Sequence, residues 1–138
     1  MEAVPNKPTA ISLAQHTYWN LAGHNSGNIL DHSIQIRANH VTPVDQNTIP
    51  TGEIMPVKGT PFDFTAEKRI GESIHEFYTG NYVNGVVGKG GAVYGKHAGL
   101  CLETQGFPNA INQPNFPSIV VQPGEKYQHT MLFEFSVE

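Results

Sequence analysis

The density of turn-forming residues restricts the fold of this chain more than any other feature. Its 138 residues include 14 glycines and 10 prolines. Proline lacks the backbone N–H that helix interiors and central strands need, and glycine inside a helix costs about 1 kcal/mol relative to alanine. Residues 42–61 are especially rich in both, so they can hold only short extended pieces. We therefore expect an all-β chain of short strands joined by many turns.

Alternating apolar residues mark the expected strands. Ile34, Ile36 and Ala38 follow the period of two that is typical of a half-buried strand. Near the end, residues 118–121, a turn at 122–125 and a long strand to the C-terminus predict a hairpin. Further strands are expected at 100–104 and within the glycine-rich stretch 80–99, at Tyr82, Val86, Val87, Val93 and Tyr94.

A single helix is expected, at residues 65–77. Ile70, Ile74 and Phe77 share one face at helical spacing, and Thr65 has the side chain of an N-terminal cap. Gly71, in the middle, opposes a helix. The rest of the chain predicts mostly antiparallel sheet.

Composition excludes several classes of protein. The formal charge is −4, with Lys+Arg 8 and no basic run, which argues against a nucleic-acid partner. The longest wholly aliphatic run is 119–121, far short of the roughly 20 apolar residues of a membrane span. Cys101 is the only cysteine, which excludes an internal disulfide and a multi-cysteine zinc site. The first residues lack the features of a signal peptide. We expect one domain over residues 1–138 and a cytoplasmic protein.

Histidines at intervals of eight invite comparison with a metal site: His16, His24, His32 and His40. Local zinc-binding pairs usually stand about three to five residues apart. The Gly- and Asn-rich loop 20–31 would also interrupt any common strand face. We therefore predict no metal site.

Two other local patterns are weak. Residues 90–97 approach a phosphate-binding loop, but His97 stands where a hydroxyl is needed and a strand, not a helix, follows. Cys101 has the chemistry of a nucleophile, yet its neighbours Leu100 and Leu102 favour an ordinary semi-buried thiol.

Two segments are unlike generic sheet. Residues 16–21 (HTYWNL) combine an imidazole, two large aromatic rings and an amide, which are groups that a sugar-binding cleft uses. Residues 102–105 (LETQ) place a carboxylate opposite two leucines. Composition alone favours a core role for Tyr18 and Trp19 and a solvated Glu103. Spacing alone does not select His16 and Glu103 from the other histidines and acids.

With their surroundings, these segments resemble the aldose 1-epimerase (galactose mutarotase) family. The similar stretches follow one another along nearly the whole chain: 15–23 (QHTYWNLAG), 43–45 (PVD) with 49–53 (IPTGE), 99–105 (GLCLETQ), 112–114 (NQP) and 123–125 (PGE). The resemblance implies a large antiparallel β-sandwich that interconverts the α and β anomers of hexoses such as galactose and glucose, without a cofactor. It also implies that His16 is the catalytic acid, that Glu103 is the base and that both bind the sugar together with Tyr18.

The chain also departs from the family pattern. Met1–Ala3 resembles an internal strand, so the N-terminal half of the sandwich, with an arginine and a histidine of the sugar site, is expected to be absent. A second gap falls near Glu76, where the family carries an aspartate that binds sugar hydroxyls. We expect a partial, truncated domain with weak turnover that self-associates through exposed sheet edges. The alternatives are a non-catalytic carbohydrate-binding module and an inert truncated product.

Overall fold

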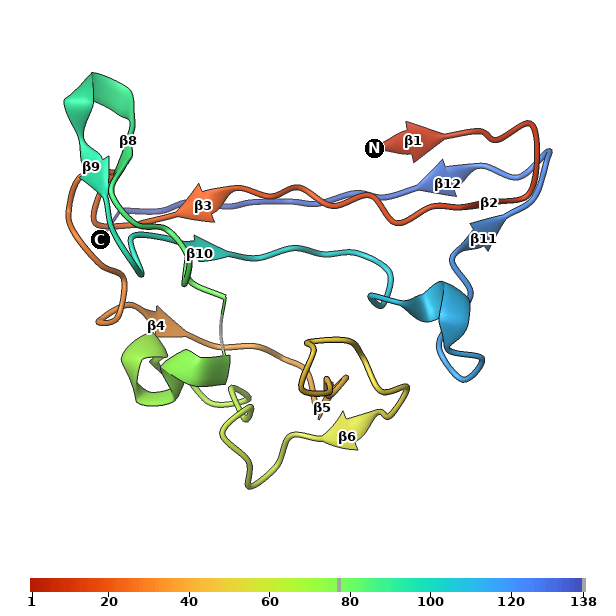
Figure 1. The fold of residues 1–138 in the computed structure, drawn as a ribbon, viewed down its shortest axis with the longest axis horizontal. Helices are drawn as coiled ribbons and strands as arrows, with labels where there is room; N and C mark the ends of the chain where they lie inside the picture. The colour runs from red at the N-terminus through yellow and green to blue at the C-terminus, as the bar shows by residue number, and fades with distance from the viewer. Residues whose placement is uncertain (77, 138) are drawn as a thin grey trace. The chain divides into compact units, whose positions relative to one another are not determined.

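The computed structural model describes residues 1–76 and 78–137, and these form very short strands and 3-10 helices (Figure 1). The strands are β1 (Glu2–Ala3), β2 (Thr9–Ala10), β3 (Tyr18–Trp19), β4 (Ser33–Ile34), β5 (His40–Val41), β6 (Met55–Pro56), β7 (Lys68–Arg69), β8 (Val86–Val87), β9 (Val93–Tyr94), β10 (Leu100–Cys101), β11 (Val120–Val121) and β12 (Tyr127–Gln128). The helices are η1 (Ile70–Glu76), η2 (Lys89–Gly91) and η3 (Ala110–Asn112). The predicted all-β class is confirmed.

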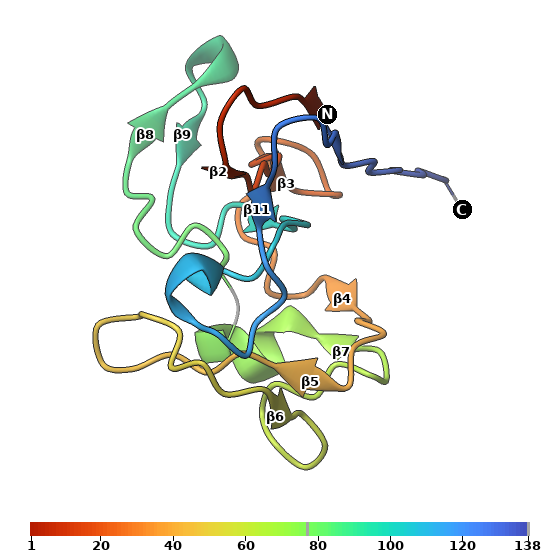
Figure 2. The same ribbon diagram turned by 90° about the vertical axis from the view of Figure 1, so that its right-hand side faces the viewer.

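Strand pairing among the described residues is antiparallel throughout. The pairs are β1 with β12, β2 with β11, β3 with β10, β4 with β7, β5 with β6 and β8 with β9. Only the last pair is a tight hairpin, and it projects from its surroundings in two views (Figure 1 and Figure 2). Most pairs therefore join segments that are far apart in the sequence.

The chain divides into two compact units, neither of them a continuous stretch. The first unit contains Met1–Gln15, Thr42–Glu53 and Glu103–Glu138, and the second contains His16–Val41 and Ile54–Leu102. That the chain is one partial domain stays a prediction.

The core of the second unit is small and aliphatic. Ile29, Ile70 and Leu100 are 0%, 1% and 6% exposed, and Trp19 and Ile34 pack against them. Leu100 lies opposite Trp19 in the β3–β10 pair, so the strand register delivers both side chains to this core. This cluster supports β3 from one side.

The first unit holds its proline-rich loop through amide side chains. Gln113 Nε2 donates to the carbonyl of Pro50 at 3.0 Å, and Asn115 Nδ2 donates to the carbonyl of Gly52. The rings of Phe107 and Phe116 meet edge to face, with centroids 5.1 Å apart. Two motif stretches, 49–53 and 112–114, thus belong to one local assembly.

The predicted helix at 65–77 is wrong over its first turn. Residues 68–69 form β7, and a 3-10 helix begins only at Ile70, with non-helical dihedrals at Ser73. The N–H of Ile70 donates to His32 O and that of Gly71 to Leu30 O, both at 2.9 Å. These donors bond to a distant loop, and Thr65 does not cap a helix. Phe77 lies outside the described residues. η2 and η3 were not predicted.

The predicted C-terminal hairpin is also wrong, although its turn exists. The N–H of Glu125 donates to Gln122 O at 3.0 Å, and Gly124 has φ +91°, which closes the turn at 122–125. However, β11 pairs with β2 and β12 with β1. Instead of pairing with each other, β11 and β12 therefore pair with strands near the N-terminus.

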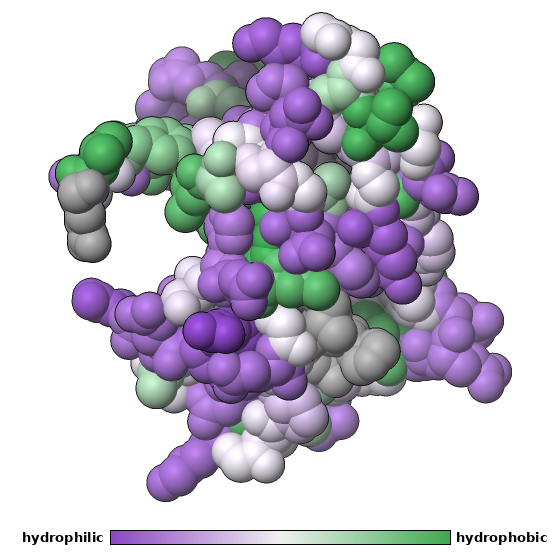
Figure 3. Space-filling view, turned by 90° about the vertical axis from the view of Figure 1, so that its left-hand side faces the viewer, coloured by the Kyte–Doolittle hydropathy of each residue, from purple (hydrophilic) through white to green (hydrophobic). Residues whose placement is uncertain are grey.

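Apolar side chains remain exposed in both units. Val86, Val87 and Val93 are 53%, 70% and 63% exposed, and the hairpin that carries them gives a hydrophobic area at the upper right of Figure 3. In the first unit, Leu132 and Val137 are 89% and 99% exposed. Among the described residues, no helix is both long and apolar enough to cross a membrane.

Candidate active site

Three rings of the second unit gather at the start of β3. The centroid of the His16 ring lies 5.2 Å from that of Tyr18 and 6.1 Å from that of Tyr78. The two tyrosine rings are 6.2 Å apart, and their hydroxyl oxygens are hydrogen-bonded at 2.9 Å. His16 and Tyr18 are exposed, so this ring cluster is open to solvent. It presents an imidazole and two phenols side by side.

Cys101 attaches β10 to this ring cluster. In the antiparallel register Cys101 lies opposite Tyr18, and its Sγ is 3.5 Å from His16 Nδ1. The backbone N–H of Cys101 also donates to Tyr78 O at 3.4 Å. Cys101 is 8% exposed, so it is buried rather than semi-buried as predicted.

A buried threonine fixes the turn after Tyr78. Thr79 is fully buried, and its Oγ1 lies 2.9 Å from Asn81 Oδ1 and 2.7 Å from His97 Nδ1. Gly80 follows with φ +69°, a conformation that residues with a Cβ rarely adopt. These contacts fix the backbone of the turn that follows Tyr78.

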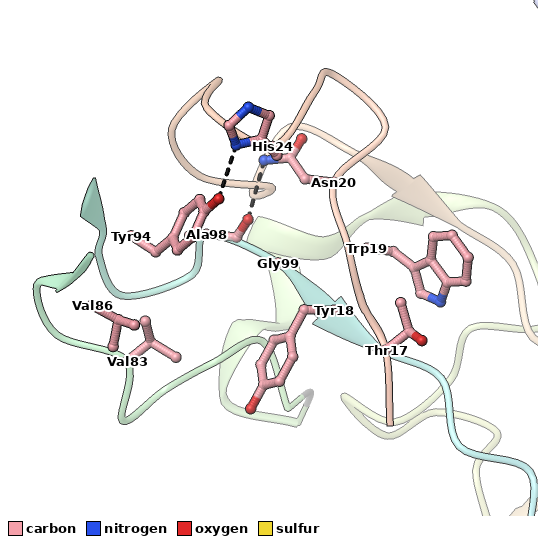
Figure 4. A pocket seen from close by; sticks show the side chains of 10 residues that line it. All are labelled: Thr17, Tyr18, Trp19, Asn20, His24, Val83, Val86, Tyr94, Ala98 and Gly99. Atoms are coloured by element: carbon pink, nitrogen blue, oxygen red, sulfur yellow. Dashed lines mark hydrogen bonds between the residues drawn. The ribbon is translucent and has the colours of Figure 1, made fainter. Parts of the chain in front are cut away.

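A cavity of about 520 Å³ lies beside the ring cluster, and Tyr18 belongs to both. Figure 4 shows Val83, Val86 and Tyr94 gathered on the side to which the Tyr18 ring points, while Trp19 points elsewhere. The lining residues are Thr17, Tyr18, Trp19, Asn20, His24, Val83, Val86, Tyr94, Ala98 and Gly99.

Polar contacts brace one end of this cavity. His24 Nδ1 lies 2.8 Å from the Tyr94 hydroxyl, and Asn20 Nδ2 donates to Ala98 O at 3.1 Å (Figure 4). Among the residues that the structure describes, those lining the cavity carry no acidic, lysine or arginine side chain. A cavity with aromatic and aliphatic walls and a few polar groups suits an uncharged ligand that has an apolar face.

Of the predicted site residues, the structure brings His16 and Tyr18 together. Tyr18 is 45% exposed, so the core role that composition favoured for it is wrong, whereas Trp19 does pack on the core. Glu103 is half-buried in the first unit, and its role opposite His16 stays a prediction. Its neighbour Leu102 is 41% exposed.

Sequence analysis did not identify Tyr78, His24 and Tyr94 as site residues. The approach of Tyr78 to His16 depends on the turn at Thr79 and on pairing with β10, for which the local sequence carries no signal. The sequence did carry a weak signal for Cys101, because the alternation of a strand places Cys101 on the same face as Glu103.

The evenly spaced histidines have separate partners in the second unit. His24 contacts Tyr94, and His32 Nε2 accepts a hydrogen bond from the N–H of Leu21 at 3.0 Å. His16 and Cys101 bring two atoms of the zinc-ligand type together.

Comparisons with known proteins agree with this geometry. The model of the aldose 1-epimerase family matches residues 1–86 and, in a second block, residues 75–134. The galactose mutarotases of Sus scrofa and Homo sapiens are 40% and 38% identical over 179 aligned positions, which cover 98% of this chain and 52% of each relative. Since the chain has 138 residues, the relatives contain internal residues without a counterpart here. The chain spans about half the length of the curated relatives that it matches.

Solved structures show the same fold. An aldose epimerase homologue from C. elegans superposes with a TM-score of 0.83 at 24% identity, over 91% of this chain and 51% of that one. A galactose 1-epimerase from Lactobacillus acidophilus gives 0.73 at 25% identity, over 91% and 48%. These neighbours confirm the fold expected from the resemblance. On the family match and the level of identity, the chain belongs to the aldose 1-epimerase family.

Proposed function

We propose that this chain carries the acid–base half of an aldose 1-epimerase site and acts on free hexoses such as galactose and glucose. The observation that carries the proposal is the ring cluster, in which His16 lies against Tyr18 and Tyr78 at the start of β3. Aromatic rings pack on the apolar faces of sugars, while phenols and imidazoles reach their hydroxyls. In a member of the aldose 1-epimerase family, this arrangement of rings is suited to a pyranose substrate.

The reaction needs two proton transfers and no further group. His16 donates a proton to the ring oxygen, and Glu103 removes the proton of the hydroxyl on the anomeric carbon. The bond between that carbon and the ring oxygen breaks, which leaves an aldehyde and a hydroxyl. Rotation of the aldehyde and reversal of both transfers close the ring with the other configuration. Positioned acids and bases each accelerate such steps by about 10²–10⁴-fold.

The family resemblance supports the choice of this acid and this base, which stand near the paired strands β3 and β10 in the sequence. Leu100 lies opposite Trp19 and Cys101 opposite Tyr18. Glu103 follows this pair two residues further along the chain. The two oxygens that exchange protons are bonded to one carbon, so acid and base need to be close. We infer from the family resemblance that Glu103 is this base.

A carbohydrate-binding module without turnover is the second candidate. The ring cluster and the cavity both belong to the second unit, whereas Glu103 belongs to the first. The aromatic groups proposed to bind the sugar therefore all lie in one unit. Since orientation of the substrate supplies a large part of catalysis, we expect turnover well below that of the longer relatives.

Polarimetry of freshly dissolved α-D-galactose tests the proposal, with spontaneous mutarotation subtracted. His16→Ala and Glu103→Gln should each remove most of the enzymatic rate, and the double variant should cost little more, because both groups serve one step. His40→Ala and Glu67→Gln are matched controls at exposed positions and should leave the rate unchanged.

The outcomes separate the candidates. Turnover that survives Glu103→Gln contradicts the role of Glu103 as base. Calorimetric binding of galactose without turnover identifies the binding module. Absence of both binding and turnover identifies an inert product.

A further inference from the structure

We propose that Asn84 is a site of spontaneous modification, at which the chain converts its own side-chain amide into an isoaspartyl linkage and loosens one wall of the cavity. Asn84 is followed by Gly85, and this is the only Asn-Gly pair in the sequence. Asparagine is among the thermolabile residues, and a following glycine has no Cβ to hinder attack by its backbone nitrogen. The inference concerns the β8–β9 hairpin and does not depend on the proposed acid and base.

The reaction needs water and no other reactant. The backbone nitrogen of Gly85 loses its proton and attacks Cγ, the side-chain carbonyl carbon of Asn84. A bond forms between them, the bond from Cγ to the amide nitrogen breaks, and the amide leaves as ammonia. Water then opens the resulting succinimide at one of its two carbonyls. Opening at the main-chain carbonyl leaves an isoaspartyl linkage, in which the backbone runs through Cβ and Cγ. Opening at the side-chain carbonyl leaves an ordinary aspartyl residue.

The fold leaves both reacting groups accessible. Asn84 and Gly85 are exposed. Among the described residues, neither the side-chain amide of Asn84 nor the N–H of Gly85 has a hydrogen-bond partner. A Cβ placed on Gly85 would meet no atom within 4 Å, so the backbone here is open to solvent. Cyclisation therefore requires no contact to be broken first.

Other asparagines of the second unit are held more firmly. Asn25 is also exposed and is followed by the small residue Ser26. However, the N–H of Ser26 donates to Gly23 O at 3.2 Å, so the nitrogen that would attack is already engaged. The side-chain amide of Asn20 donates to Gly27 O at 3.2 Å. We expect both asparagines to react more slowly than Asn84.

The segment that carries Asn84 is anchored on both sides. Before it, the N–H of Val83 donates to Gly80 O at 3.0 Å, and after it Val86 pairs with Tyr94 in the β8–β9 hairpin. Val83 and Val86 both line the cavity. An isoaspartyl linkage adds one backbone atom between these anchors, and the hydrolysis adds a carboxylate. Since each strand of the hairpin has only two residues, we expect the hairpin to loosen.

Peptide mapping by mass spectrometry tests the modification in the purified chain, aged in mildly alkaline buffer. The peptide that contains residue 84 should gain the mass difference between an amide and an acid and become labelled by protein isoaspartyl methyltransferase. Its rate should be close to that of a free peptide with the sequence of residues 81–88. Asn84→Gln should abolish the signal, and Asn25 is the slower internal control. A native rate at least about tenfold below that of the free peptide would show that the fold protects the site and overturn the proposal.

Amide hydrogen exchange tests the effect on the cavity wall. The N–H of Gly88 donates to Ala92 O at 2.8 Å within the hairpin. Its protection should fall by roughly 10-fold in the isoaspartyl form, separated by chromatography, because local opening becomes easier. Asn84→Asp adds the charge without lengthening the backbone and should keep the native protection. The N–H of Thr51, which donates to Pro43 O in the first unit, should be unchanged. Equal protection of Gly88 in the native and isoaspartyl forms, or an equal loss in Asn84→Asp, would overturn the proposal.

Discussion

The hydroxyl oxygens of Tyr18 and Tyr78 lie 2.9 Å apart, although the residues are 60 positions apart in the chain. Tyr18 belongs to β3, and Tyr78 precedes the turn at Thr79 and Gly80. Their hydrogen bond joins a strand to a turn on the side of the molecule where His16 lies. The site therefore depends on how these two segments meet.

Removing either hydroxyl should weaken this connection modestly. Both side chains are substantially exposed, at 45% and 39%, so Tyr18→Phe and Tyr78→Phe should each cost at the low end of about 0.5–1.5 kcal/mol. The double variant should cost less than the sum, because one bond is lost in all three proteins. Urea unfolding of the native chain and the three variants measures the coupling. Strict additivity would contradict the bond.

Gly99 should tolerate no side chain beneath Tyr18. A Cβ at this position would lie 3.2 Å from Tyr18 Cβ and 3.3 Å from Trp19 O, tighter than normal packing. Gly99→Ala should cost about 1–3 kcal/mol of stability and disturb the cavity wall. Gly95→Ala is the matched control, since a Cβ there meets no atom within 4 Å, and it should stay within about 0.5 kcal/mol. Equal effects on thermal unfolding would contradict this packing.

The hydroxyl of Thr79 should matter more than its methyl group. Thr79→Val keeps the shape of the side chain but removes the hydroxyl. Asn81 Oδ1 and His97 Nδ1 then lose their hydrogen bonds to Oγ1, which should cost about 1–3 kcal/mol of stability. Thr79→Ser keeps the hydroxyl and loses one buried methyl, worth about 0.8 kcal/mol. Chemical denaturation ranks the two variants. If Thr79→Ser is the less stable of the two variants, the methyl group contributes more to stability than the hydroxyl does.

The loop at Asp45 should loosen in acid. Its carboxylate accepts hydrogen bonds from the N–H of Ile49 at 3.0 Å and of Asn47 at 2.8 Å, and these bonds lower the pKa of Asp45. A lowered pKa in the folded state means that the charged form stabilises the loop above the unfolded-state pKa of about 3.9. This stabilisation is lost as the pH falls through the folded pKa.

Amide hydrogen exchange at Ile49 measures that transition. In the native chain, the protection of the Ile49 amide should decrease as the pH is lowered. Asp45→Asn keeps an acceptor but no titrating group, so its protection should stay level after correction for intrinsic exchange. A native chain whose protection at Ile49 does not change in acid would contradict the role of Asp45.

We expect the chain to self-associate through its exposed edges and apolar C-terminal segment. Each described sheet has two strands, so every strand is an edge strand. Leu132 and Val137 are nearly fully exposed. Leu132→Lys with Val137→Lys should shift size-exclusion elution towards the monomer, whereas Tyr82→Lys, at an exposed residue of the second unit, should not. A native chain that elutes as a sharp monomer contradicts the prediction.

Local patterns in the sequence were enough for the turns and the all-β class. Proline and glycine act on their own dihedrals, so the turn at 122–125 follows from nearby residues. Val86, Val87, Val93 and Tyr94 were expected in strands and lie in β8 and β9. The alternation of Ile34 and Ile36 against exposed neighbours also appears in the structure. These features need no knowledge of distant segments.

Strand partners and the ring cluster were decided only by the tertiary structure. Each strand has two residues, and such short ladders carry almost no register information of their own. The helix predicted at 65–77 did not form over residues 65–69, because the N–H groups of Ile70 and Gly71 bond to the loop at 30–32. The sequence, through family resemblance, singled out His16 and Tyr18. Tyr78 and Cys101 lie beside His16 because segments far apart in the chain are hydrogen-bonded to one another. A pattern along the sequence carries no information about such contacts.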